Sequence, residues 1–202
     1  MDEIARGVAG NTADAMSSED VEAIKQSLKR GAAALRDAGV PFVVGGGLAS
    51  WARGGPESGH DVDFLVKPED AEVGWKALGE AGMRLERPPE GWLFKAHDGE
   101  VLIDLIFAPS GLEMTDDLFD RADDIEVLAQ RMRVLSLEDL MITKLACLRE
   151  HEVDYDAHLE IARSLREQID WADVRRRSPE NPYVAAFFTL AEGLGLVPPA
   201  ES

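Results

Sequence analysis

Three carboxylates at two places in the chain could together bind a metal ion. Asp61 and Asp63 lie at alternate positions of an otherwise apolar segment, 61–66. Because alternate residues of a β-strand project from the same face, a strand here places both carboxylates together. Asp104 interrupts a second apolar segment, 101–107, where an ionised carboxylate is costly unless a cation or hydrogen bonds compensate it. Mg²⁺ prefers oxygen ligands and leaves coordination positions for substrate phosphates. The three residues therefore predict metal-assisted phosphoryl transfer.

A run of glycines precedes the first carboxylate pair. Val43 and Val44 lead into Gly45-Gly46-Gly47, which indicates a strand, a turn, a short helix and then the Asp-x-Asp strand. A dinucleotide-binding fingerprint would need a further glycine after this run, and a P-loop would need Gly-Lys-Ser/Thr; the sequence has neither. A phosphate-binding turn and a simple tight turn both stay open, and the carboxylates favour the first.

This combination of motifs resembles the DNA polymerase beta superfamily of nucleotidyltransferases. The shared features are a Gly-Gly turn, an Asp-x-Asp strand and one more Asp on a neighbouring strand, and they extend from about residue 43 to residue 107. A looser likeness continues into 144–149, which is similar to a helix of the abortive-infection type and other small bacterial nucleotidyltransferases. The resemblance implies an enzyme that moves a nucleoside monophosphate from an NTP to an acceptor hydroxyl.

The resemblance also implies roles for the three carboxylates. Asp61, Asp63 and Asp104 would together hold one Mg²⁺ ion, which lowers the pKa of the acceptor hydroxyl. Asp61 and Asp63 would hold a second Mg²⁺ ion, which binds the triphosphate and stabilises the leaving pyrophosphate. Asp104 would also help to activate the acceptor hydroxyl.

The phosphate-binding part departs from the family pattern. Backbone amides at Gly45 and Gly46 would approach the triphosphate, but the usual Ser or Thr after the glycine pair is Gly47 here. Amides at the start of a helix still bind phosphate, and Ser50, one turn later, is the candidate for the missing hydroxyl. Lys144 lies on the apolar face of a predicted helix, where it either reaches the phosphates or a catalytic carboxylate, or extends its charge to water.

The histidines and the cysteine are weaker candidates for site residues. His60, directly before the carboxylate pair, either orients the acceptor or gates the metals, or is a surface turn residue. His151, Asp154 and His158 suggest a metal cluster, but acidic residues at a helix start are explained by capping and the helix dipole. Cys147 is the only cysteine, which excludes an intramolecular disulfide, and it is predicted to be a buried apolar residue.

Charge restricts the partners. The chain has a formal net charge of −18, and non-specific binding to nucleic acid needs basic residues, so a long DNA or RNA substrate is disfavoured. The basic run 175–177 could contact a tRNA or an acidic partner, although a solvated helix end is more common. The acceptor is expected to be a small molecule or a protein, with a tRNA end still possible. No apolar run approaches the roughly 20 residues of a membrane span, and the N-terminus lacks signal-peptide features, so a cytoplasmic location is expected.

Hydrophobic periodicity predicts a mixed α/β part followed by an all-helical part. Together with this pattern, the resemblance implies an α+β fold with a mixed-sheet nucleotidyltransferase core flanked by helices and followed by a C-terminal helical bundle. We expect a flexible tail at 1–16, the core at 17–135 and the helical region at 136–202. A capping box at Ser17 starts the first helix, and Asp98-Gly99 predicts a hairpin between strands at 92–97 and 100–107. The other expected elements are a strand after Pro41, a strand ending at 134–135, and helices at 69–81, 116–122, 136–148, 156–166 and 179–194.

A non-catalytic protein on the same scaffold is the alternative function. It would be a regulatory or toxin–antitoxin partner that binds a nucleotide, or none. Gly47 favours this alternative because it removes a phosphate contact. The intact triad of Asp61, Asp63 and Asp104 opposes it, because a buried carboxylate without a function is costly. A purely structural helical interaction protein leaves the triad unexplained.

Overall fold

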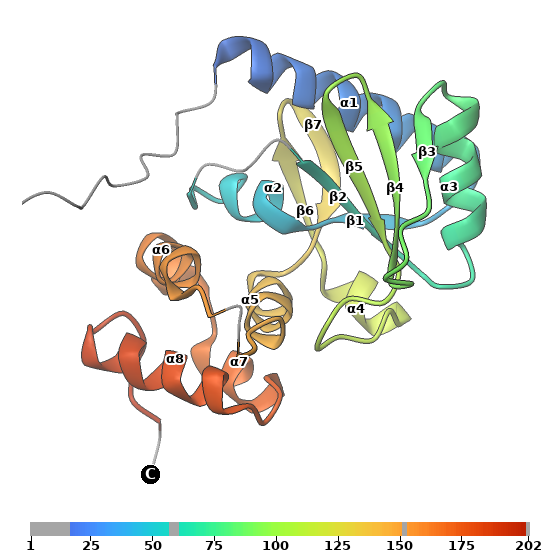
Figure 1. Cartoon of the computed structure of the whole chain (residues 1–202). Helices are drawn as coiled ribbons and strands as arrows, with labels where there is room; N and C mark the ends of the chain where they lie inside the picture. Colours follow the sequence, from blue (N-terminus) through green and yellow to red (C-terminus); the bar gives the residue numbers. More distant parts are fainter. Residues whose placement is uncertain (1–16, 57–60, 151–152, 201–202) are drawn as a thin grey trace, which may run out of the picture.

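The computed structural model describes residues 17–56, 61–150 and 153–200, so the tail predicted at 1–16 lies outside the described residues. A seven-stranded mixed sheet forms the centre, with the strand order β3-β4-β5-β2-β1-β7-β6. Figure 1 shows this sheet twisting across the upper part of the molecule. The strands are β1 (Phe42–Val44), β2 (Asp61–Val66), β3 (Arg84–Glu86), β4 (Leu93–Asp98), β5 (Val101–Ile106), β6 (Asp123–Val127) and β7 (Gln130–Val134).

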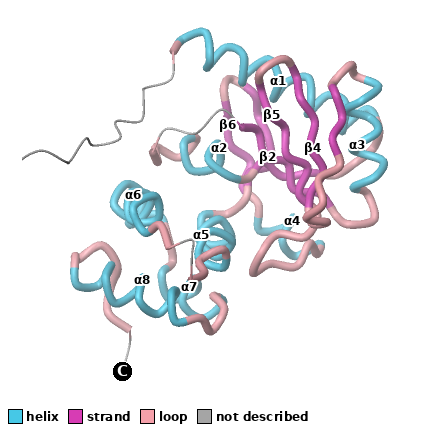
Figure 2. The backbone as a smooth tube through the Cα atoms, viewed as in Figure 1, coloured by secondary structure: helices cyan, strands magenta, loops and turns pink. Residues whose placement is uncertain are grey.

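Helices flank the sheet and then gather beside it. Figure 2 shows that α1 and α3 pack along one side of the sheet, while α5 to α8 form a separate helical cluster. The helices are α1 (Ser18–Asp37), α2 (Gly46–Trp51), α3 (Ala71–Glu80), α4 (Asp116–Arg121), α5 (Leu137–Ala146), α6 (Tyr155–Leu165), the 3₁₀ turn η1 (Arg166–Gln168), α7 (Trp171–Arg177) and α8 (Pro182–Gly193). This architecture confirms the predicted α+β fold.

Alternation along the two central strands decides where the carboxylates point. Phe64 of β2 and Ile103 of β5 are fully buried and lie against Gly31 of α1, where a Cβ atom would stand 2.8 Å from Cε2 of Phe64. Asp63 and Asp104 are the chain neighbours of these residues and therefore project from the opposite face of the sheet. The helices of the first face thus fix the direction of both carboxylates.

Local sequence signals explain most of the elements. The capping box at α1 is present, since the Ser17 hydroxyl accepts from the Asp20 amide at 3.1 Å and the Asp20 carboxylate accepts from the Ser17 amide at 3.1 Å. Val73 of α3 is 50% exposed although it is apolar. Gly74 faces the core instead, where the missing side chain lets Leu35 of α1 approach. The strands β3 and β6 and the helix α7 were not predicted.

The predicted hairpin forms, but its turn lies one residue later than predicted, which shifts the pairing of the two strands by two residues. Asp98 pairs with Val101 as the last rung of β4 and β5, so Gly99 and Glu100 form the turn. Gly99 has a φ of +65°, which suits glycine at the first central position of a tight hairpin turn. The shift places Lys95 of β4 directly opposite Asp104 of β5.

The elements change from mixed to all-helical between β7 and α5, close to the boundary predicted at residue 136. The hydrophobic core nevertheless continues from the sheet into the helices, and α5 packs against both α2 and α7.

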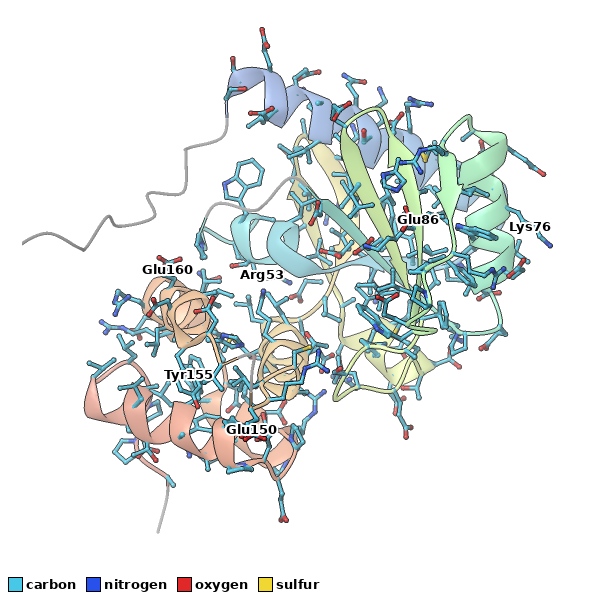
Figure 3. All side chains as sticks on the ribbon, viewed as in Figure 1. Arg53, Lys76, Glu86, Glu150, Tyr155 and Glu160 are labelled. Atoms are coloured by element: carbon cyan, nitrogen blue, oxygen red, sulfur yellow. The ribbon has the colours of Figure 1, made fainter. Side chains whose placement is uncertain are left out.

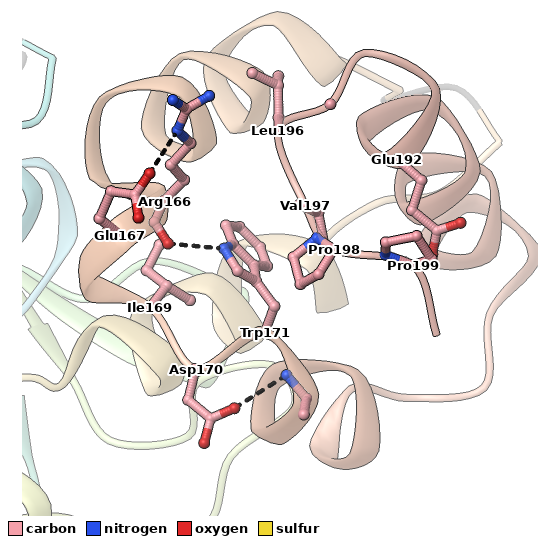
Figure 4. A pocket seen from close by; sticks show the side chains of 12 residues that line it. Arg166, Glu167, Ile169, Asp170, Trp171, Glu192, Leu196, Val197, Pro198 and Pro199 are labelled. Carbon is pink, nitrogen blue, oxygen red and sulfur yellow. Dashed lines mark hydrogen bonds and ion pairs between the residues drawn. The ribbon is translucent and has the colours of Figure 1, made fainter. Parts of the chain in front are cut away.

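The helical region contains a cavity of about 770 Å³ between the turn that precedes α7 and the chain that follows α8 (Figure 4). In its wall, the indole nitrogen of Trp171 donates to the Arg166 carbonyl at 3.2 Å.

Candidate active site

The strand pairing brings the predicted carboxylates to one face of the sheet. β2 and β5 run parallel, and Asp63 lies directly opposite Asp104 in their register. Asp61 stands two residues before Asp63 on the same face and is exposed. Within 17–56, 61–150 and 153–200, no three His, Cys, Asp or Glu side chains are gathered closely enough to hold a metal ion by themselves. The backbone therefore aligns the three predicted ligands, while their side chains are not drawn together.

A row of charged residues crosses the sheet at this level. Glu86 on β3 lies opposite Lys95 on β4, Lys95 lies opposite Asp104 on β5, and Asp104 lies opposite Asp63 on β2. The Lys95 ammonium is 3.1 Å from Oδ1 and 3.5 Å from Oδ2 of Asp104. Neither Lys95 nor Glu86 was predicted from the sequence. Period-two alternation places Lys95 on a polar face, but only the hairpin register shows that it contacts Asp104.

Burial and like charges act together on the two central carboxyls. Burial, followed by repulsion from Asp104 and Asp61, raises the pKa of Asp63 to about 7, against the opposing effect of Lys144 and Lys95. Burial also raises the pKa of Asp104, and the hydrogen bond from Lys95 opposes this rise. The site thus disfavours the ionised forms of Asp63 and Asp104, and a bound cation would favour these ionised forms again.

Asp63→Asn is expected to stabilise the protein when divalent cations are absent. The folded-state pKa of Asp63 lies above its ordinary value of 3.8, so the folded state binds more protons between about pH 4 and 7 and loses stability as the pH rises through this window. The variant should match the wild type near pH 4 and exceed its melting temperature at pH 8. Thermal unfolding in EDTA across this range tests the expectation. A variant that is less stable than wild type at pH 8 would contradict it.

The glycine turn touches the central carboxylate. The Gly45 amide donates to the Asp63 carbonyl at 2.9 Å, which joins the turn to β2. Gly46 has a φ of +55°, and a Cβ atom there would lie 1.6 Å from Oδ2 of Asp63. Any side chain at Gly46 would collide with the carboxylate. Both the backbone conformation and the close approach therefore require glycine, whereas a simple tight turn would require only the conformation.

The other predicted phosphate-binding residues occupy different surroundings. Gly47 lies in the first turn of α2 and is partly buried. Ser50 is 1% exposed, its hydroxyl has no hydrogen-bond partner within 17–56, 61–150 and 153–200, and a Cβ atom on Gly55 would lie 2.1 Å from it. Lys144, on α5, is partly buried and lowers the pKa of Asp63 by its charge. The structure thus brings Lys144 towards the carboxylates and packs Ser50 beneath Gly55.

The remaining candidates do not form a second site in the described part of the chain. His60 and His151 lie outside the described residues. The Asp154 carboxylate caps α6 by accepting from the Asp156 amide at 3.0 Å, as the capping interpretation predicts. The prediction that Cys147 is buried is wrong, because it follows the last turn of α5 and is exposed.

The basic run in α7 is engaged within the protein. Arg175 is 2.5 Å from the Glu192 carboxylate and lies over the ring of Phe188. Arg176 and Arg177 both pair with Asp173. These contacts tie the run to acidic side chains of the same protein, although the Arg176 side chain stays 70% exposed.

Comparisons with known proteins agree with this architecture. The solution structure of the antibiotic-resistance factor ANT(2'')-Ia is similar with a TM-score of 0.60 and 19% identity, covering 89% of this chain and 97% of that one. The crystal structure of ANT(2'')-Ia in complex with adenylyl-2''-tobramycin gives a TM-score of 0.60 and 19% identity, covering 82% of this chain and 97% of that one. These likenesses show the fold. No curated protein matches the sequence.

No described helix has the length and apolar character needed to cross a membrane.

The family described as uncharacterised nucleotidyltransferase matches residues 12–191, which include the glycine turn, all three aspartates and Lys144. The resemblance drawn from these motifs is thereby confirmed at the level of the family, and the chain belongs to this nucleotidyltransferase family.

Proposed function

We propose that the protein transfers a nucleoside monophosphate from an NTP to an acceptor hydroxyl, with Mg²⁺ held by Asp61, Asp63 and Asp104. One observation carries the proposal: Asp63 and Asp104 are direct neighbours on parallel strands, and the backbone of Gly46 lies against the Asp63 carboxylate. The two carboxylates supply oxygen ligands for a cation, and the glycine turn beside them lets a polyphosphate approach the same place.

The donor set fits a hard divalent cation. Its ligands are carboxylate oxygens alone, and no donor among the described residues forms a hydrogen bond to the Asp63 carboxylate, so its lone pairs are available. Bound Mg²⁺ would supply Lewis-acid stabilisation of the charge on the transferring phosphoryl group. Asp104 would accept the acceptor's proton or orient its hydroxyl, and Lys144 would neutralise charge on the phosphates or on Asp63.

The proposed acceptor is a small molecule or a protein side chain. The net charge of −18 opposes binding of a long polyanion and favours a cationic acceptor. The compact basic run 175–177 pairs with acidic side chains of the same protein, which weighs against a tRNA end as the acceptor.

A non-catalytic nucleotide-binding partner is the second candidate, and two observations favour it. Gly47 brings no hydroxyl to the turn, and the Ser50 hydroxyl is buried beneath Gly55. In this case the triphosphate would rely on backbone amides and Lys144 alone, so its affinity decides between the two functions.

Thermal unfolding with ATP, GTP, CTP and UTP, each with and without Mg²⁺, tests the proposal. A ligand at 100 times its Kd adds about 2.7 kcal/mol, a shift of several degrees for a chain of this size. We expect a Mg²⁺-dependent shift with one nucleotide in the wild type and none in Asp63→Asn, each compared with its own ligand-free melting temperature. If no nucleotide shifts the wild type, the non-catalytic partner is the better description.

A further inference from the structure

We propose that Lys95 is an internal counter-ion that competes with the divalent cation for Asp104. When the cation binds, the Lys95 ammonium would move from Asp104 to a second position beside the Glu86 carboxylate. The inference rests on the proposed metal site and adds a control on its occupancy. Lys95 would be a positioning residue. It holds Asp104 when no metal is bound and moves away when the metal binds.

The first step is the contact between Lys95 and Asp104. The ammonium lies 3.1 Å and 3.5 Å from the two carboxylate oxygens, and the Lys95 and Asp104 side chains are only 24% and 16% exposed. Mg²⁺ binds carboxylate oxygen at about 2.0–2.1 Å. Two cations at one partly buried carboxylate would repel each other strongly, because solvent screens them poorly there. Metal and ammonium therefore compete for the negative charge and lone pairs of Asp104.

The second step is the existence of another position for the ammonium. Glu86 lies directly opposite Lys95 on the side away from Asp104, and the charge of Lys95 contributes to lowering the pKa of Glu86, after the larger effects of His97 and Arg84. Glu86 is fixed by a 2.8 Å contact with Nε2 of His97. Opposite residues in antiparallel strands have Cβ atoms about 4.5–5.5 Å apart, within reach of a flexible lysine side chain. Figure 3 labels Glu86 beside the strands of the sheet and Lys76 on the outer side of α3.

The consequence is a metal site that opposes loading in the absence of nucleotide. Asp104 has its charge already balanced, so a lone divalent cation must displace Lys95 before it can bind there. A triphosphate brings further negative charge to the site and shifts the competition towards the metal. Lys95 then remains compensated by Glu86, which limits the cost of the displacement.

The test measures Mn²⁺ binding by the loss of the free-ion EPR signal, without nucleotide, in folded protein verified by thermal unfolding. Lys95→Met should bind Mn²⁺ about tenfold more tightly than wild type, which corresponds to about 1.4 kcal/mol. Lys95→Arg keeps the charge and should remain close to wild type. Glu86→Gln removes the second position and should bind about threefold more weakly.

Lys76→Met is the matched control for the loss of one positive charge. Lys76 is 64% exposed on α3 and pairs with Glu72 at 3.6 Å, away from the charged row (Figure 3). It should leave Mn²⁺ affinity unchanged. An equal gain in Lys76→Met and Lys95→Met would show a general charge effect and overturn the inference.

The outcomes separate this inference from the proposed function. If wild type binds Mn²⁺ and Asp63→Asn does not, but Lys95→Met has unchanged affinity, the metal site stands and the counter-ion role is wrong. If Lys95→Met gains affinity that Asp63→Asn removes in the double variant, both stand. If neither wild type nor Lys95→Met binds Mn²⁺ without nucleotide, the counter-ion role is wrong, and the Mg²⁺-dependent thermal shift with nucleotide then decides the proposed function separately.

Discussion

Asp104→Asn is expected to lower the rate of nucleotidyl transfer by on the order of 10³-fold or more while retaining Mg²⁺-dependent NTP binding. In the proposed site, Asp61 and Asp63 suffice for the ion on the triphosphate, whereas Asp104 is needed for the ion at the acceptor hydroxyl. Loss of several kcal/mol of transition-state stabilisation corresponds to this change in rate. Asp63→Asn should lose both the transfer and the nucleotide-dependent thermal shift.

Transfer of label from α-³²P-NTP to a panel of hydroxylated small molecules and proteins measures the rate, and thermal unfolding measures binding. Asp116→Asn is the matched control, because the Asp116 side chain is 86% exposed and pairs with Lys67. The assignment of separate roles is refuted if Asp104→Asn retains transfer, or if it loses nucleotide binding together with Asp63→Asn.

The part of the site that could be predicted from sequence depends on strong local signals. A strand has a period of two, so Asp61 and Asp63 had to share a face wherever the strand packed. Their meeting with Asp104 follows from the apolar neighbours of each residue, which must face the core on both strands. These signals are contained within short segments, and the structure agrees with them.

The contacts that sequence did not reveal depend on register and on distant neighbours. A turn centred on Asp98 and Gly99 would place Leu102 opposite Lys95, whereas the observed turn at Gly99 and Glu100 places Asp104 there. One residue thus decides which side chain faces the lysine. β6 was missed because two of its first four residues are Asp, which favour turns in a local analysis, and its pairing with β7 compensates for this.

The helical region shows the same limit of local analysis. The run 175–177 suggested a solvated helix end, because the sequence does not show which acidic residues approach it in space. Glu192 follows Arg175 by 17 residues and Asp139 precedes Arg177 by 38. Cys147 was predicted to be buried from its apolar character, but the end of α5 exposes it.

The largest stability effect is expected for Asp139→Ala, which should lower the free energy of unfolding by about 3 kcal/mol. Asp139 has no exposed surface, and its carboxylate accepts from Nε of Arg121 on α4 at 3.1 Å and from Arg177 on α7. The Asp139 amide donates to the Ser136 hydroxyl at 3.2 Å, which caps α5. One carboxylate thus joins three helices at the transition from the sheet to the helical region. Its loss would leave two guanidinium groups without their buried partner.

For a chain of 202 residues this change should lower the melting temperature by about 6–12 °C. Asp173→Ala is the control, because Asp173 pairs with the same Arg177 but is 20% exposed, so we expect a loss of at most about 1 kcal/mol. Replacing Asp139, Arg121 and Arg177 together by Leu, Met and Met should recover most of the loss, because an apolar set leaves no unpaired charge. If Asp139→Ala and Asp173→Ala destabilise equally, the buried carboxylate has no special role in joining the helices to the sheet. If only Asp139→Ala also weakens the nucleotide-dependent thermal shift, the joint additionally sets the position of α5 and therefore of Lys144 beside Asp63.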